Sequence, residues 1–217
     1  MALLDDKTQQ DVRAFLADMA GKVKIVVFTQ EYECPFCGET RQVVEEVAAL
    51  SDKISQEVHD LQGDKEAATK YNIDKAPAIA ILGPDDVDYG LRYYGIPSGY
   101  EFSSFLHDIK AAAAGPDGIG LSAATVAALD ALPSPVHLQI FVTPTCPYCP
   151  QAVTLAHAMA IASRNVRADA VEATEFPHLS QRYKVFGVPR TVINEDHYLE
   201  GAAPEEMLLE KILSAVK

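Results

Sequence analysis

The sequence predicts an α/β protein made of two tandem copies of one fold, each a mixed central sheet flanked by helices. Two motifs, Cys-Pro-Phe-Cys at 34–37 and Cys-Pro-Tyr-Cys at 146–149, contain the only four cysteines, and each precedes a proline 43 residues after its first cysteine. Around these prolines, residues 71–77 match residues 183–189 at the same offset of 112 residues. A fixed offset indicates an internal repeat. The 217 residues leave about 100 for each copy, enough to bury a core of its own.

The first copy alternates strands and helices. Asp5 or Asp6 can cap a first helix, and Gly21 is expected to end it. Residues 23–28 form an apolar run typical of a strand covered on both faces. The remaining expected elements are a helix opening at Cys34-Pro35, a strand at 54–61, a short helix at 65–71, a hairpin of 77–82 with 91–94, and a closing helix through 102–109.

A helix-breaking segment at 115–118, Gly-Pro-Asp-Gly, divides the copies into expected domains of residues 1–115 and 116–217. Ser122 can cap the first helix of the second copy. Its other expected elements are a strand at 136–142, a helix from 147 to about 164, a strand at 166–171, a short helix at 177–183, a hairpin of 190–194 with 197–201, and a last helix through 207–212. This order gives a mixed sheet covered by helices.

Composition narrows the functional classes. The formal net charge of −13 argues against a nucleic-acid partner, which requires clustered basic residues. The first residues lack the basic and apolar regions of a secretory signal, and no stretch approaches the roughly 18 apolar residues of a membrane helix. We therefore expect a cytoplasmic protein without a membrane partner. In a reducing cytosol, paired cysteines are more often catalytic, redox-sensing or metal-bound than structural.

Because of the two motifs, their prolines and the duplication, each copy resembles a thioredoxin-fold domain. The tandem is similar to the glutaredoxin-like protein disulfide oxidoreductases, a resemblance that covers essentially the whole chain. It implies an enzyme that reduces, forms or isomerises protein disulfides through two redox-active disulfides, Cys34–Cys37 and Cys146–Cys149. It implies no cofactor, protein disulfides as substrates, and a thioredoxin-reductase-like flavoprotein as a partner.

The chemistry gives each cysteine a role. A thiolate is the attacking species, and a helix N-terminus favours the anion. Cys34 and Cys146 are therefore expected to be exposed nucleophiles. Cys37 and Cys149, one turn further along, are expected to be shielded resolving thiols, and exchange passes through a mixed disulfide.

The resemblance also implies a substrate-binding backbone. The peptide bonds Ala76-Pro77 and Val188-Pro189 are expected to be cis and to present backbone groups to an extended substrate segment.

Two features depart from the related families. Thioredoxins carry a buried acid in the strand before the motif, whereas this chain has Lys24 in the first copy and His137 and Gln139 in the second. A proton from the resolving thiol must therefore pass to water or to another carboxylate. Only fragments of the glutaredoxin glutathione site are present, so we do not expect tight glutathione binding.

Alternatives remain open. Four thiolates could bind one zinc ion, but 108 residues separate Cys37 from Cys146, whereas zinc knuckles usually lie roughly 15–20 residues apart. One pair, more readily the first, could be a static disulfide. The tandem could also be an electron relay that passes electrons from a flavin reductase to a peroxidase. The six histidines lack metal-binding spacing and are expected to be surface or hydrogen-bonded residues.

The two sites differ in charge. Glu31, Glu33 and Glu39 lie within five residues of Cys34, whereas no acid lies near Cys146 in sequence. Nearby carboxylates disfavour a second anion, so Cys146 is expected to be the more acidic and faster nucleophile.

Overall fold

The structure, a computed structural model, describes residues 2–216. We call residues 2–115 the first half and residues 116–216 the second half. The elements of the first half are α1 (Asp6–Leu16), β1 (Val23–Thr29), α2 (Cys37–Ala48), β2 (Ile54–Asp60), α3 (Lys65–Lys70), β3 (Ala78–Leu82), the 3-10 turn η1 (Pro84–Asp86), β4 (Asp88–Tyr94) and α4 (Glu101–Ala114).

A second 3-10 turn, η2 (Gly115–Gly118), leads into the second half. The elements of that half are α5 (Ala123–Asp130), β5 (Val136–Val142), α6 (Cys149–Ala162), β6 (Val166–Glu172), α7 (Pro177–Arg182), β7 (Arg190–Ile193), β8 (His197–Glu200) and α8 (Glu205–Ala215). Each half thus repeats one order of elements, and the fold class expected from the sequence is confirmed.

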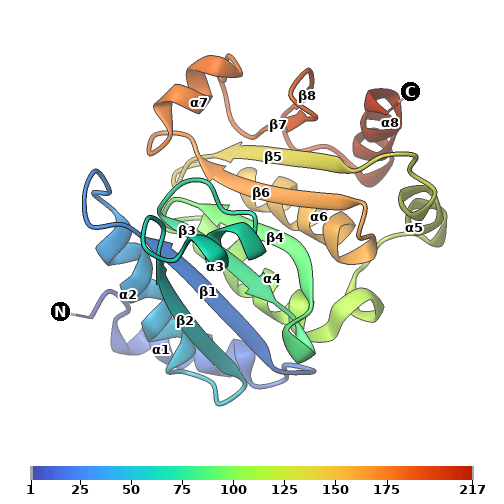
Figure 1. Ribbon diagram of the computed structural model, residues 1–217. Coiled ribbons are helices and arrows are strands. Elements are labelled where there is room, and N and C mark those ends of the chain that lie inside the picture. Colours follow the sequence, from blue (N-terminus) through green and yellow to red (C-terminus); the bar gives the residue numbers. More distant parts are fainter. Residues whose placement is uncertain (1, 217) are drawn as a thin grey trace.

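The strands of both halves form one mixed sheet in the order β2-β1-β3-β4-β6-β5-β7-β8 (Figure 1). The sequence did not predict this continuity, which arises because β4 pairs in parallel with β6 from Leu91 opposite Ala168 to Tyr94 opposite Val171. The pairing directions make β1, β4, β6 and β5 parallel to one another. The carboxyl ends of β1 and β5 therefore lie at the same edge of the sheet, and a cysteine motif follows each of them.

Helices cover both faces of the sheet. One core lies beneath α1, α2, α4, α5, α6 and α8 and takes every second strand residue, for example Ile25, Val27, Leu138 and Ile140. The other core lies beneath α3 and α7 and takes the alternate residues, for example Phe28. This alternation follows from the two-residue period of a strand.

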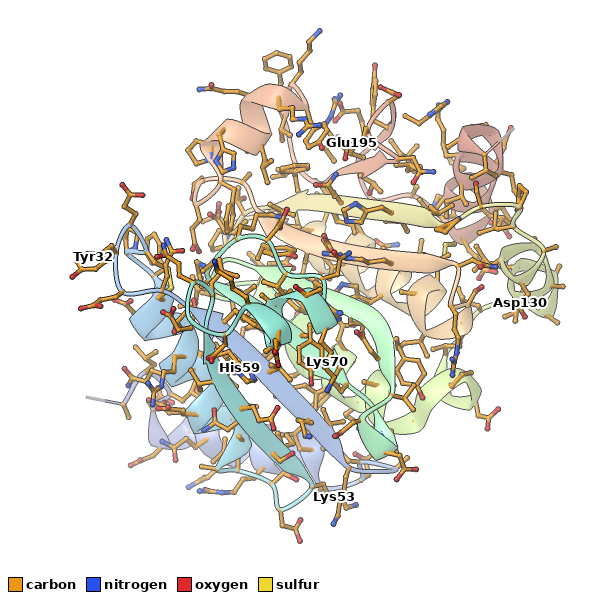
Figure 2. The ribbon with its side chains drawn as sticks, viewed as in Figure 1. Tyr32, Lys53, His59, Lys70, Asp130 and Glu195 are labelled. Carbon is orange, nitrogen blue, oxygen red and sulfur yellow. A yellow bond between two sulfur atoms is a disulfide. The ribbon has the colours of Figure 1, made fainter. Side chains whose placement is uncertain are left out.

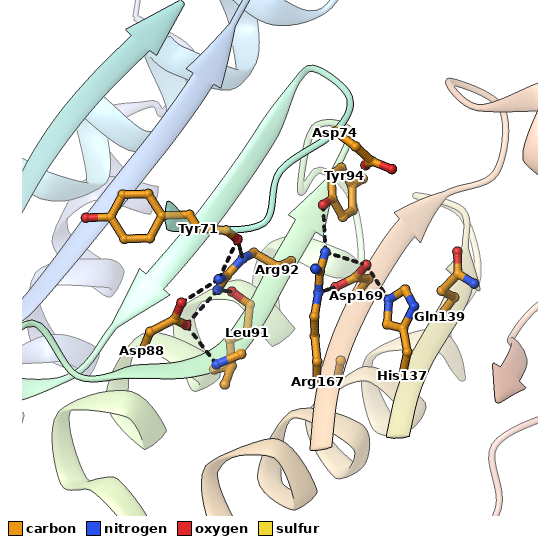
Figure 3. A network of polar contacts seen from close by, with 12 residues as sticks. Tyr71, Asp74, Asp88, Leu91, Arg92, Tyr94, His137, Gln139, Arg167 and Asp169 are labelled. Carbon is orange, nitrogen blue, oxygen red and sulfur yellow. Dashed lines mark hydrogen bonds and ion pairs between the residues drawn. The ribbon is translucent and has the colours of Figure 1, made fainter. Parts of the chain in front are cut away.

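Polar contacts strengthen the junction between the halves on the α3 and α7 face (Figure 3). Arg167 on β6 donates to the Tyr94 hydroxyl on β4 at 2.9 Å and pairs with Asp169, which also contacts His137 at 2.7 Å. Burial acts to raise the pKa of Asp169, but His137 and Arg167 hold it well below its usual range. On β4 itself, Arg92 is 2% exposed and forks between Asp88 and the carbonyl oxygen of Tyr71.

Two helix boundaries differ from those that the sequence predicts. The first helix ends at Leu16 rather than at Gly21. The helices of the two motifs begin at Cys37 and Cys149 rather than at Pro35 and Pro147. The reason is that each motif makes a tight turn first, with the N–H of its second cysteine bonded to the carbonyl of its first. Within residues 2–216, no helix is long and apolar enough to span a bilayer.

Candidate active site

Both cysteine pairs form disulfides. The Cα atoms are 5.4 Å apart in Cys34–Cys37 and 5.5 Å apart in Cys146–Cys149, within the range that a disulfide requires. Three strands separate β1 from β5, so the two sites lie roughly 19 Å apart at a strand spacing of about 4.8 Å. At this separation the four sulfur atoms cannot surround one zinc ion.

A cis proline accompanies each disulfide, as the resemblance implies. The peptide bonds Ala76-Pro77 and Val188-Pro189 are cis, and they immediately precede β3 and β7, the strands that pair with β1 and β5. Within residues 2–216, the backbone N–H groups of Ala76 and Val188 have no hydrogen-bond partner. These groups are available to an extended segment of another protein, which is the geometry of strand addition.

The four cysteines differ in exposure. Cys37 and Cys149 are 5% and 0% exposed, as expected of shielded thiols. Cys34 is half-buried, whereas Cys146 is only 7% exposed. The expectation that both first cysteines are exposed is therefore wrong for Cys146.

Backbone groups surround the sulfur atoms. The N–H of Gln30 donates to Cys37 Sγ at 3.3 Å. Cys146 Sγ lies 3.7 Å from the carbonyl oxygen of Val188. A disulfide sulfur has no proton to donate, so the contact with Val188 can become a hydrogen bond only when Cys146 is a thiol.

A loop of the first half explains why Cys146 is buried. Between β4 and α4, the N–H of Tyr100 donates to the carbonyl oxygen of Pro144 at 2.9 Å, two residues before Cys146. Gly99 packs so closely there, with φ at +60°, that a Cβ atom would lie 2.2 Å from the Pro144 oxygen. The first half thus packs against the segment that leads into Cys146, whereas Cys34 has greater exposure.

The next residue along this loop is an acid that the sequence analysis missed. Glu101, the first residue of α4, is 2% exposed, and Ser104 Oγ donates to its Oε2 at 2.9 Å. Its Oε1 has no hydrogen-bond partner within residues 2–216. Burial raises the pKa of Glu101 to about 7, and the nearby Asp108 adds to this effect, whereas Ser104 and His157 oppose it.

The sequence offered no signal for Glu101. It precedes Cys146 by 45 residues and belongs to the other copy of the repeat. Only the packing of α4 beside the second motif brings it to this site.

The surroundings of the first disulfide are more acidic than those of the second. Glu31, Glu33 and Glu39 are exposed, and none of them forms an ion pair within the described residues. Glu175, from the loop after β6, accepts a hydrogen bond from the N–H of Ile96 at 2.8 Å. Burial raises the pKa of Glu175 to about 7, and the charges of Glu172 and Glu39 add to this effect.

Exposed aromatic side chains occur at both sites. Phe36 and Tyr148, inside the two motifs, are 43% and 68% exposed, and Phe186, three residues before Pro189, is 92% exposed. Tyr32 projects from the loop before Cys34 (Figure 2). An open groove of about 720 Å³ between α4 and α6 includes none of the four cysteines in its lining. Exposed aromatic side chains thus lie next to both disulfides, which suits contact with a macromolecular partner.

Comparison with known proteins finds similarity to a thioredoxin domain and to several redox proteins. A family model described as a thioredoxin domain matches residues 136–214. The solved protein disulfide oxidoreductase of Aeropyrum pernix has a TM-score of 0.89 and 28% identity, covering 98% of this chain and 93% of its own. A structure of the alkylhydroperoxide reductase AhpF from Enterococcus faecalis has a TM-score of 0.88 and 25% identity, covering 99% of each chain.

Sequence relatives include the AhpF component of the alkyl hydroperoxide reductase of Pseudomonas putida. It is 27% identical over 179 residues, which is 79% of this chain and 34% of the relative. The corresponding protein of Pseudomonas aeruginosa is 23% identical over 97% of this chain and 37% of its own length. The chain therefore spans about a third of the length of these relatives.

Proposed function

We propose that the chain is a tandem thioredoxin-fold disulfide oxidoreductase that reduces protein disulfides, with the Cys146–Cys149 pair as its principal site. Dithiol exchange is the chemistry of this family. The single observation that favours the second site is the buried Glu101, which follows Tyr100, the residue whose N–H bonds to Pro144 just before this motif. A group that exchanges protons near pH 7 is suited to general acid–base work.

In the proposed cycle, the Cys146 thiolate attacks one sulfur of a substrate disulfide. A mixed disulfide forms and the first substrate thiolate leaves. Cys149 then transfers its proton to Glu101 and attacks Cys146 Sγ, which closes Cys146–Cys149 and releases the second substrate thiolate. Glu101 returns the proton to a departing thiolate. Two electrons move from the cysteine pair to the substrate, and the protons balance.

At the first site, we assign Cys34 as the nucleophile and Cys37 as the resolving thiol. The burial of Cys37 and the greater exposure of Cys34 support these roles. Ala76 and Val188, each preceding a cis proline, would pair with the backbone of an extended substrate segment. We take residues 1–115 and 116–217 as the two domains and the cytoplasm as the location.

The experiment that tests this proposal is insulin reduction with dithiothreitol as the electron source. We expect turnover by the intact chain, turnover by a Cys34→Ser/Cys37→Ser variant, and little turnover by a Cys146→Ser/Cys149→Ser variant. Turnover that depended only on the first pair would contradict the assignment of the principal site.

A second candidate function is an electron relay, favoured by the similarity to the AhpF proteins over nearly the whole chain. In that role, a flavoprotein reductase would reduce this chain, which would then reduce a peroxidase. The two functions differ in their partners. Peroxide consumption that required this chain together with a flavoprotein reductase and a peroxidase, without insulin reduction, would favour the relay.

A further inference from the structure

Besides Glu101, the interface between the halves contains buried polar groups that the proposed cycle does not use. Helix α4 packs on α6, the helix that begins with Cys149. Three polar residues of α4, Glu101, Ser104 and Asp108, share one helical face at positions i, i+3 and i+7, and each is at most 2% exposed. Opposite them on α6 lies His157, which is 0% exposed.

Asp108 and His157 form a closed pair. Asp108 Oδ2 accepts a hydrogen bond from the Tyr93 hydroxyl and lies 2.5 Å from His157 Nδ1. The other ring nitrogen, Nε2, lies 3.2 Å from the carbonyl oxygen of Ala168. A carbonyl can only accept, so Nε2 carries a proton. One further proton is then shared between Nδ1 and the carboxylate. With this proton on Nδ1, the two residues form an ion pair that has no net charge but a strong internal dipole.

Asp108 lies about two helical turns beyond Glu101 on the same face of α4, and the charges of Asp108 and His157 both influence Glu101. The charged or titratable groups that face this region are Asp108 on α4, Tyr93 on β4 and His157 on α6, and the thiols of the second motif lie at the start of α6. The negative end of the dipole, Asp108, opposes ionisation of Glu101, and the positive end favours it. In a buried interface such charges are only weakly screened.

We propose that the Asp108–His157 pair is a positioning pair for the second disulfide: it fixes the charge around Glu101 and so sets the pH range in which Glu101 can take the proton of Cys149. This inference rests on the proposed function. Within residues 2–216 the first site has no corresponding pair, because the pair depends on α4 of one half packing against the motif helix of the next.

The experiment measures insulin reduction against pH in a Cys34→Ser/Cys37→Ser background, so that only the second site turns over. Asp108→Asn removes the negative charge that opposes ionisation of Glu101. The part of the pH–rate profile in which Glu101 ionises should therefore move to lower pH. His157→Gln leaves two buried carboxylates to compete for a proton, and this part of the profile should move to higher pH. Each displacement should reach about half a pH unit, which is a threefold change in rate on the steep limb.

Two controls separate an effect on Glu101 from a structural one. The double variant Asp108→Asn/His157→Asn removes both charges and should lie closer to the parent profile than either single variant. In a Glu101→Gln background, Asp108→Asn should no longer displace the profile. Displacements in the same direction for both single variants, or an undiminished displacement without Glu101, would overturn the inference.

A measurement on the unsubstituted ring covers the case in which a variant fails to fold. Nitrogen-15 NMR of His157 in the intact protein should show a proton on Nε2 and a second proton on Nδ1 or shared between Nδ1 and Asp108. A ring with no proton on Nδ1, either bound or shared with Asp108, would overturn the inference. Complete absence of insulin reduction by the second site would instead reject the proposed function itself.

Discussion

Tyr100 donates its backbone N–H to the carbonyl oxygen of Pro144 at 2.9 Å, and this contact fastens the start of α4 to the segment that leads into the second disulfide. The hydrogen bond joins a residue of the first half to one of the second. It holds Gly99 and Tyr100 against Pro144, two residues before Cys146, and Glu101 follows directly in the chain. The second site is thus assembled from both halves, and its burial follows from their packing.

This contact depends on a glycine, and Gly99→Ala should disrupt it. The backbone of Gly99 has φ at +60°, and the new Cβ would lie 2.2 Å from the Pro144 oxygen. We expect a loss of about 1–3 kcal/mol in the free energy of unfolding, together with faster alkylation of Cys146 in the reduced protein, because the loop must move away. Urea unfolding and iodoacetamide kinetics provide the two measurements.

Gly120→Ala is the matched control for this substitution. A Cβ atom on Gly120 would meet nothing within 4 Å, so stability and alkylation should stay near those of the parent. If Gly99→Ala behaved like Gly120→Ala in both measurements, the loop would not be the cover of Cys146.

Glu101→Gln should change the pH dependence of stability. The pKa of Glu101 is about 7 in the folded chain, against 4.5 for an ordinary glutamate. The folded state therefore binds more protons than the unfolded state between about pH 4.5 and 7, and stability falls as the pH rises through this window. Glutamine has no charge to bury, so the variant should gain stability over the parent above pH 7 and little near pH 4.5.

The gain should amount to roughly 1–3 kcal/mol at pH 8, measured by chemical unfolding at several pH values. Glu175 has a raised pKa of the same sign and is intact in the variant, so part of the slope should persist. The same substitution should slow insulin reduction by the second site near pH 7. A variant with unchanged stability at pH 8 and unchanged activity would remove Glu101 from the proposed cycle.

Substitutions of single cysteines should separate the two steps of exchange. Cys34→Ser and Cys146→Ser should abolish exchange at their own sites, because a hydroxyl is far less acidic than a thiol. Cys37→Ser and Cys149→Ser should trap mixed disulfides, since the resolving step is lost. Non-reducing electrophoresis followed by mass spectrometry would detect the adducts. Full insulin reduction by the resolving-thiol variants without a trapped adduct would refute the assigned roles.

Much of this architecture follows from local sequence patterns, and the rest depends on contacts between the halves. The repeat and the strand periodicity predicted the order of elements, and the resemblance to the thioredoxin fold implied both cis prolines. They could not predict that β4 is an interior strand, since its buried Arg92 resembles a solvent-facing edge residue and is satisfied only by Asp88 and the Tyr71 carbonyl. The same pairing of halves buries Cys146 and Glu101, so neither could be recognised from residues near it in the chain.

The ranking of the two nucleophiles is the sharpest test of how the sites differ. Greater exposure should make Cys34 the faster nucleophile, whereas local charge should make Cys146 the faster one, because Glu31, Glu33 and Glu39 lie near Cys34 in sequence. Each exposed carboxylate within roughly 8 Å contributes only about 0.5 kcal/mol in water before screening by salt. Together they should still leave reduced Cys34 about threefold to fivefold slower than Cys146 near pH 7.

Alkylation rates against pH, measured in variants that retain one cysteine pair, decide the ranking. Replacement of Glu31, Glu33 and Glu39 by glutamine should accelerate Cys34, and 1 M salt should narrow the difference between the sites, because both changes weaken the same repulsion. Glu45→Gln, on the same helix α2 but two turns beyond Cys37, is the matched control and should leave the rate of Cys34 near the parent value. A parent Cys34 that reacted faster than Cys146 near neutral pH would show that exposure outweighs the carboxylates.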